Sequence, residues 1–343
     1  MLATKILLIL GVAVVAVLAA VGAALCYMTS VPGRSFSGAL PPLNGEEADI
    51  SRRLRTHVDA IASVPHNVRH HDNLERAARH IETELKALGY EPVPQVYTSD
   101  GKAVRNIEAT IEPAIGGNAP TLVVGAHYDS YGDAPGANDN GTGVAAILEL
   151  ARLLSDVRER SQRRIRLVLF VNEEPPYFQT SEMGSFRYAQ LLAERREPVL
   201  GMISLETLGC FFEQPGTQQY PPPFGLIYPN KGNFIAFVGM LRSRDFVRML
   251  VGSFRTHTHF PSVGGVAPGA IPGIAWSDHW SFEQFGYAAA MITDTALFRY
   301  AHYHVPTDTS DKVDFDKLAR VTKGIERTLR EIIGIQDPEA IAR

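Results

Sequence analysis

The sequence predicts an α/β protein of three layers, in which helices cover both faces of a mixed, mostly parallel central sheet, preceded by one transmembrane helix. Two observations lead to this prediction. From residue 121 onward, apolar runs of strand length alternate with segments whose apolar residues recur at helical spacing. Strands that alternate with helices form parallel pairs, and their connecting helices cover the sheet. The second observation is an N-terminal stretch without charge.

Residues 6–28 contain no charged side chain and as a helix would extend about 34 Å, enough to cross a hydrocarbon core of roughly 30 Å. A cleaved signal peptide is the alternative, because Lys5 supplies a short basic start, but the apolar part of a signal usually has only about 7–15 residues. We therefore expect residues 1–28 to form an uncleaved anchor. One positive charge lies on each side of the span, Lys5 before it and Arg34 after it, so the charge distribution does not set its orientation. The signal-like start of the chain predicts that the folded domain lies outside the cytoplasm. Secretion after cleavage is the alternative.

The composition is that of a folded globular protein, with 343 residues, 45% hydrophobic and 20% charged. Residues 29–45 are rich in Pro, Gly and Ser without periodicity, which predicts a linker, and we expect one folded domain over 46–338. The net charge of -4 and the lack of a long basic tract exclude a nucleic-acid partner. Cys26 lies in the apolar span and Cys210 in the domain, so no disulfide forms within the domain.

The folded part is expected to open with two helices, 48–64 and 72–90, the second capped by Asp72 and ended by Gly89. Further helices are expected at 143–154, 184–196 and 314–335, and strands at 121–129, 164–172, 199–207, 233–239 and 287–294. Residues 211–232 form a long Pro-rich aromatic segment. Loops of this length are usually lids or binding walls, here with Tyr220, Phe224 and Tyr228 as wall residues, although a solvated excursion is the alternative.

Polar residues gather where the predicted strands end. In open parallel sheets ligands bind outside the carboxyl ends of the strands, so these side chains should converge. Two imidazoles and several carboxylates without cysteine favour one or two catalytic zinc ions, because structural zinc sites are usually closed by thiolates. The candidate residues are His127, Asp129, Asp139, Glu173, Glu174, Glu206 and, near the C-terminus, His304.

The blocks GAHYDS, GANDNGTGVA, NEE, WSDHWSF and YHVPTDT follow one another in the chain, and through them the sequence resembles the M28 family of zinc metallopeptidases, the co-catalytic di-zinc aminopeptidase group. The resemblance runs from about Arg69 to the final helix. It implies a zinc-peptidase (phosphorylase/hydrolase-like) fold and an exopeptidase, most often an aminopeptidase that hydrolyses N-terminal residues from peptides. The implied site has two zinc ions bridged by Asp139, one completed by His127 and Glu206 and the other by Glu174 and His304, with Glu173 as general base.

The chain departs from the family at Glu206, where Asp is usual. The longer side chain can still reach a metal, and it leaves the geometry and the metal preference of that half of the site open. A ligating imidazole donates its other N–H to a carboxylate or carbonyl, and Asp129 and Asp308 are the expected acceptors, with a helix cap as the alternative for Asp308. Asp278 and His279 are expected to position substrate, with a core or capping role as the alternative. The family also implies a cis peptide after Asp139.

Two other functions fit parts of the pattern. Glutaminyl cyclases resemble this family and share the HYDS and EE blocks but are single-zinc acyl transferases; they carry Trp before the last zinc histidine, where this chain has Tyr303. A non-catalytic binding ectodomain would have lost its metals, whereas all five implied ligands are present. The expected partners are a peptide substrate and, through the N-terminal helix, a membrane. The sequence does not distinguish aminopeptidase from carboxypeptidase action, and it predicts no oligomeric state.

Overall fold

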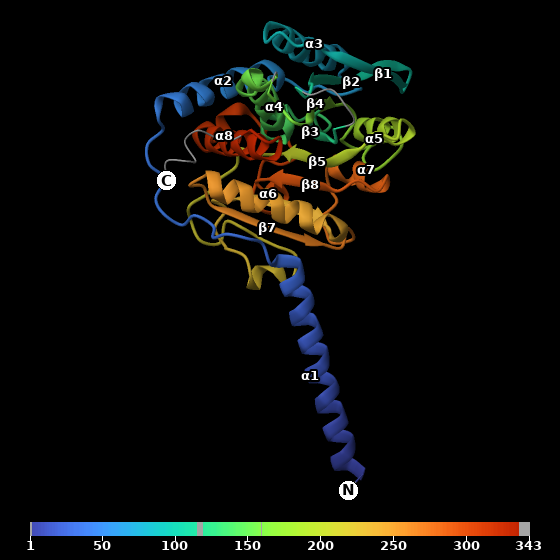
Figure 1. Cartoon of the computed structure of the whole chain (residues 1–343), viewed down its shortest axis with the longest axis vertical. Helices are drawn as coiled ribbons and strands as arrows, with labels where there is room; N and C mark the ends of the chain where they lie inside the picture. The colour runs from blue at the N-terminus through green and yellow to red at the C-terminus, as the bar shows by residue number, and fades with distance from the viewer. Residues whose placement is uncertain (1, 115–118, 159, 336–343) are drawn as a thin grey trace.

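The central element of the computed structural model is one eight-stranded sheet of order β1-β2-β4-β3-β5-β8-β6-β7 (Figure 1). The structure describes residues 2–114, 119–158 and 160–335, so the last residues of the expected domain, 336–338, lie outside it. The strands are β1 Val93–Ser99, β2 Lys102–Ile111, β3 Thr121–His127, β4 Arg164–Phe170, β5 Val199–Glu206, β6 Ile235–Met240, β7 Ser262–Ala267 and β8 Ala289–Thr293.

The four middle strands, β4, β3, β5 and β8, run parallel to one another. On one side β2 joins β4 and β1 joins β2, both antiparallel. On the other side β6 is antiparallel to β8 and parallel to β7. The predicted mixed α/β sheet is therefore confirmed, with its parallel strands in the centre.

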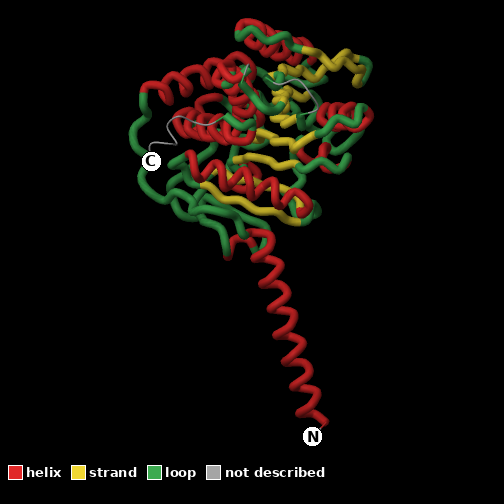
Figure 2. The backbone as a smooth tube through the Cα atoms, viewed as in Figure 1, coloured by secondary structure: helices red, strands yellow, loops and turns green. Residues whose placement is uncertain are grey.

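Helices cover both faces of this sheet, as Figure 2 shows by secondary structure. Helices α4, α6 and α8 pack on one face, with α2 against α4 and α8, while α5 and α7 lie together on the other. The bounds are α1 Leu2–Thr29, α2 Gly45–Ile61, α3 His71–Ala87, α4 Thr142–Leu153, α5 Gly184–Glu194, α6 Arg244–His257, α7 His279–Gln284 and α8 Phe315–Ile332.

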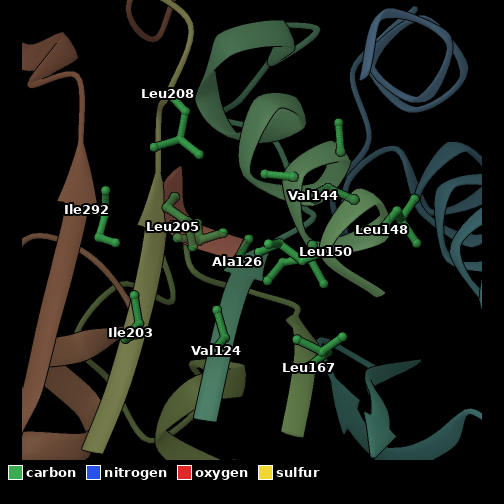
Figure 3. Close-up of a cluster of buried hydrophobic side chains, with 14 of the residues drawn as sticks. Val124, Ala126, Val144, Leu148, Leu150, Leu167, Ile203, Leu205, Leu208 and Ile292 are labelled. Atoms are coloured by element: carbon green, nitrogen blue, oxygen red, sulfur yellow. The ribbon is translucent and has the colours of Figure 1, made fainter. Parts of the chain in front are cut away.

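The period of two in the strands divides the core into two layers. Val124 and Ala126 of β3 face the large cluster under α4, drawn in Figure 3, whereas Val123, next to Val124, joins the smaller cluster under α5 and α7. Leu167 and Val168 of β4 divide in the same way. Because both faces are buried, the middle strands read in the sequence as continuous apolar runs.

Two helix starts differ from simple sequence patterns. Asn44 caps α2 by a capping box in which its side chain accepts from the Glu47 N–H at 2.8 Å and Glu47 accepts from the Asn44 N–H at 3.0 Å. The prediction that Asp72 caps the next helix was wrong, since α3 starts one residue earlier and Asp72 lies in its first turn, where a carboxylate still favours the positive end of the helix dipole. Gly89 follows that helix in the left-handed conformation, at φ 77°.

Helix α1 projects away from the domain (Figure 1). Among the described residues, only the stretch Thr4–Thr29 is long and apolar enough to span a membrane, and none of its most apolar part is buried in the protein. An N-terminal signal sequence has the same properties. At its C-terminal end α1 packs against β7, so the exit of this helix lies beside that edge of the sheet.

Candidate metal centre

The predicted site residues converge at the carboxyl ends of the middle strands. His127 and Glu206 are the last residues of β3 and β5, and Asp139 lies in the turn η1, Ala137–Gly141, that leads into α4. Glu174 follows the end of β4, and His304 comes from the loop between β8 and α8. Parallel strands bring their carboxyl ends to one edge, so residues far apart in the chain meet there.

Asp139 lies between the two imidazoles. Its Oδ1 is 3.4 Å from His127 Nε2, and its Oδ2 is 3.0 Å from His304 Nε2. The Asp139–Asn140 peptide bond is cis. The backbone N–H groups of Asn138 and Asp139 donate to the Asp308 carboxylate at 2.9 and 3.1 Å, which fixes the turn and aims the two oxygens of Asp139 at different partners.

His127 and Glu206 form the inner group of the cluster. The Nδ1–H of His127 donates to the Asp129 carbonyl at 3.0 Å, so in the neutral imidazole the lone pair is on Nε2. This nitrogen points at Asp139 and at Glu206 Oε2, each 3.4 Å away. Glu206 also accepts from the Ser277 hydroxyl at 2.8 Å. The longer Glu side chain therefore reaches the cluster and is oriented there by a serine that the sequence interpretation had not singled out.

Glu173 and Glu174 lie past the strand and not in it. Strand β4 ends at Phe170, and Asn172 has a left-handed φ of 62°. The rule that successive strand side chains point to opposite faces therefore does not apply to the two glutamates. The Asp129 carboxylate accepts both of their backbone N–H groups, at 3.0 Å from Glu173 and 3.2 Å from Glu174. Asp129 thus positions the glutamate pair with its side chain and His127 with its carbonyl.

Glu174 and His304 form the outer group, with Glu174 Oε2 3.4 Å from His304 Nε2. The imidazole is held between two tyrosine rings, Tyr131 at 4.0 Å between centroids and Tyr303 at 3.8 Å. Sequence reasoning missed Tyr131, and treated Tyr303 only as a departure from the cyclases. The stack joins a turn after β3 to the loop after β8, and no local spacing in the sequence announces it.

The remaining candidates divide by their partners. Asp308 accepts from the Tyr300 hydroxyl at 2.7 Å and from the turn of Asp139, and Asp314 caps α8 in its place, so the hydrogen bonds of Asp308 orient the turn and not His304. His279 Nε2 lies 2.8 Å from a backbone carbonyl, and burial lowers the pKa of this residue to about 4. Asp278 is fully buried, and burial, reinforced by the Glu206 and Asp129 carboxylates, raises its pKa to about 7.

The cluster buries more negative charge than its imidazoles balance. Among the described residues, the ion pairs of Asp139, Glu173, Glu174 and Glu206 are all with His127 or His304. Burial raises the pKa of each of the three glutamates, and nearby carboxylates add to the effect. Burial opposes the charged form of His127, but Glu206 and Glu173 outweigh it and raise its pKa.

Three buried atoms in this cluster have no hydrogen-bond partner within the described part of the chain: His127 Nε2, Asp139 Oδ2 and Glu174 Oε1. Isolated buried charges are costly unless paired or bound to a metal. Two groups of donors, each with its atoms within 4.8 Å of one another, share Asp139: one is His127, Asp139 and Glu206, the other Asp139, Glu174 and His304. This donor set of imidazole nitrogen and carboxylate oxygen fits divalent zinc.

An apolar cavity of roughly 900 Å³, open mouth included, adjoins the cluster. Glu206 and Tyr303 belong to its wall, which connects the cavity to the inner and outer groups. Tyr220, Phe224 and Tyr228 of the Pro-rich segment also line it, as predicted. A bulky apolar group bound in this cavity would therefore place the atoms attached to it beside the carboxylates.

The fold and the cluster together define a hydrolase of the metallopeptidase class. The family model for peptidase family M28 matches residues 106–221, which include all the candidate ligands except His304. The chain is 38% identical over 263 residues to the uncharacterized protein YfbL of Escherichia coli K12, covering 74% of this chain and 79% of that one. The chain therefore belongs to peptidase family M28.

More distant similarities agree with the family. Leucine aminopeptidase 1 of Arthroderma otae is 28% identical over 229 residues, which are 63% of this chain and only 56% of the fungal protein. The crystal structure of the LapA aminopeptidase of Legionella pneumophila superposes with a TM-score of 0.65 at 16% identity, covering 88% of this chain and 78% of that one. The glutaminyl cyclase of Fimbriiglobus ruber shares the fold as well, with a TM-score of 0.59 at 18% identity over 90% of this chain and all of the cyclase.

Proposed function

We propose that the protein is a membrane-anchored aminopeptidase that uses two zinc ions to hydrolyse N-terminal residues from peptides. The observation that carries this proposal is the placement of Asp139, whose two carboxylate oxygens face two separate groups of donors. In this proposal His127 and Glu206 complete one ion site, and Glu174 and His304 complete the other. The bridging role of Asp139 is what separates a two-ion site from a single-ion one.

The proposed chemistry divides between the ions and the protein. Zinc ions bound in such sites act as Lewis acids, lowering the pKa of water to about 7 and stabilising charge that develops on a carbonyl oxygen. Glu173 also lies within 4.8 Å of donors on His127 and Glu174, but the two groups that share Asp139 do not need it as a ligand. Its Oε2 is 3.9 Å from His127 Nε2, and in this proposal Glu173 is the general base. It takes the proton of the attacking water and delivers it to the leaving amine, as a general base and then acid.

The apolar cavity supports a preference for a bulky apolar N-terminal residue. Its wall brings together aromatic rings and aliphatic side chains, among them Phe224, Phe237 and Met291, while Glu206 and Thr207 add polar atoms at the cluster. A side chain that fills this space leaves water, and the adjacent peptide bond then lies near Glu173. A leucine aminopeptidase among the relatives agrees with this preference.

The N-terminal segment completes the proposal. We assign residues 1–28 as an uncleaved anchor, 29–45 as a linker and 46–338 as the catalytic domain, with the domain outside the cytoplasm. The support is the exposed apolar surface of α1 and its length. Retention of the N-terminus in membrane-extracted protein, read by mass spectrometry, distinguishes an anchor from a cleaved signal.

Product analysis tests the activity. The full chain, purified in detergent and loaded with zinc, is incubated with a peptide that begins with Leu, with its N-acetylated form and with a peptide that begins with Gln. We expect release of free leucine from the first peptide only. Release from the acetylated peptide would show that a free amine is not required, while ring closure of the Gln peptide without hydrolysis would identify a glutaminyl cyclase, and the absence of any product would favour a binding ectodomain.

A further inference from the structure

The Pro-rich segment carries two large aliphatic side chains in water. Leu226, at the end of the short turn η3, Phe224–Leu226, is 91% exposed, and Ile227 is 44% exposed. Their chain neighbours point the other way, because Phe224 is buried and Tyr228 lines the apolar cavity. The segment therefore has an inner aromatic face that forms the cavity wall and an outer aliphatic tip, of which Leu226 is the most exposed side chain.

This tip lies beside the exit of α1. Gly265 of β7 contacts both the Pro-rich segment and the end of α1. A Cβ placed on it would lie 2.5 Å from the Tyr228 hydroxyl and 2.8 Å from the Met28 carbonyl oxygen. The Tyr228 hydroxyl also donates to the Gly264 carbonyl at 3.0 Å. In Figure 1 the turn η3 is the yellow element at the underside of the domain, immediately beside the top of α1. A bilayer that surrounds α1 reaches this side of the domain.

The last turn of α1 has the side chains of a membrane interface. Tyr27 is half-exposed, and the Arg244 guanidinium lies 4.3 Å from the centre of its ring while Arg244 Nε donates to the Tyr27 carbonyl at 2.8 Å. Tyrosine and arginine at the end of an apolar span are typical of the headgroup level. Asp245, a neighbouring opposite charge, lies 3.7 Å from Arg244 and is directed into solvent.

From this juxtaposition we propose that Leu226 and Ile227 insert into the lipid interface and form a second contact with the bilayer in which α1 is anchored. The inference rests on the proposed anchoring of α1. Packing of the end of α1 on β7 joins the helix to the domain, and the contact of the tip with lipid adds a second attachment that fixes the tilt of the domain on the bilayer. The rings behind the tip line the substrate cavity, so the cavity is held at the membrane surface, and the substrate class that this orientation favours is amphipathic peptides adsorbed to lipid.

Spin-label accessibility tests the insertion in the full chain, reconstituted into vesicles of phosphatidylcholine and phosphatidylglycerol. In a Cys26→Ser background, where Cys210 is buried, a nitroxide is placed by Leu226→Cys. The matched control is Val96→Cys, an exposed apolar residue of β1 at the opposite edge of the sheet, and Val17→Cys reports on α1 itself. For each nitroxide, the rate of collision with oxygen, which is concentrated in lipid, is compared with the rate of collision with a water-soluble nickel chelate.

We expect the labels at 226 and 17 to favour oxygen and the label at 96 to favour nickel. Equal nickel access at 226 and 96, with 17 in lipid, would overturn the inference and leave the anchor intact. Nickel access at 17 would overturn the anchor and this contact together. Because none of these readings depends on hydrolysis, failure of the peptidase assignment remains a separate result.

The substrate class has its own test, with Leu226→Glu and Ile227→Glu combined, since neither side chain lines the cavity. We expect the KM for a vesicle-bound amphipathic peptide to rise several-fold, while kcat/KM for a soluble leucine dipeptide does not change. An unchanged KM for the vesicle-bound peptide, or an equal loss on both substrates, would contradict the role of the tip.

Discussion

The inner and outer groups of the cluster share Asp139 but are supported in different ways. His127 and Glu206 end two neighbouring strands and are nearly inaccessible to solvent. Glu174 and His304 stand on loops, and the His304 side chain is 27% exposed. Regular backbone thus fixes one half of the site, and side-chain packing between loops fixes the other. We expect the two ions to bind unequally, with the inner one held more tightly and the outer one exchanging first.

Asp139→Asn should have the largest effect, because it changes the one residue common to both groups. Loss of a carboxylate oxygen and of its charge should weaken both ions and lower kcat/KM by more than about 100-fold, the upper limit for residues that only orient a ligand. Metal content after gel filtration and the rate with a leucine substrate measure this. Asp311→Asn, an exposed carboxylate, is the control. A variant that retained two ions would refute the bridge.

His304→Ala and His127→Ala separate the two halves. We expect His304→Ala to retain one zinc ion per chain after dialysis against a weak chelator, because the inner group is intact. His127→Ala should lose the tightly held ion, since its imidazole is the only nitrogen of the inner group. Zinc stoichiometry by atomic emission distinguishes these results. Identical stoichiometry and release rates in the two variants would show that the halves are not distinct.

Ser277→Ala sharpens the comparison within the inner group, because it removes the hydroxyl that orients Glu206. Partners of this kind typically contribute about 10–100-fold to metal affinity or activity, so a loss in that range is expected in the affinity for the first zinc ion. Ser281→Ala is the matched control, another buried serine of the same sequence block whose hydroxyl pairs with Ser185. Equal zinc affinity in the two variants would exclude an orienting role for Ser277.

The smallest predicted effect is on stability. Removal of the metal should make the stability of the fold depend more strongly on pH. Burial raises the pKa of Glu174 and Glu206 in the metal-free fold, whereas in the unfolded chain a glutamate titrates near 4.3. As the pH rises above that value the unfolded chain loses its protons first, so the metal-free fold loses stability. We expect Tm of the chelated protein to fall by several degrees between pH 5 and 8, and that of the zinc-loaded protein to fall less. Parallel curves would contradict this reasoning.

Much of the fold was predictable because the middle strands are buried on both faces. The expected strands 121–129, 164–172 and 199–207 contain β3, β4 and β5, with ends that differ by one or two residues. Strands at and near the edges were not predicted: β1 is largely exposed, β2 mixes buried and partly exposed residues, and β7 reads SVGGVA, so none of them forms an apolar run. Helices α6 and α7 were also missed, in a region where long loops interrupt the alternating pattern.

In the site, strand topology made the convergence of His127 and Glu206 predictable, because parallel strands end at one edge. The contacts that orient these ligands were not predictable, because they depend on loops that pass through residues in the left-handed conformation. Thr295 and His304 itself have φ values of 62° and 61°, which non-glycine side chains rarely adopt and which only the surrounding packing stabilises. The stack of Tyr131 on His304 follows from this path and not from any motif.

The proposed two-ion centre is tested most directly by the zinc content and hydrolysis rate of the wild type and Glu173→Gln, measured together on the full chain. We expect two zinc ions in both proteins and a loss of kcat of about 10²–10⁴-fold in the variant, the usual contribution of a general base. A variant that lost its metal along with its activity would make Glu173 a ligand and not the base. A wild type that held a single zinc ion would contradict the two-ion centre.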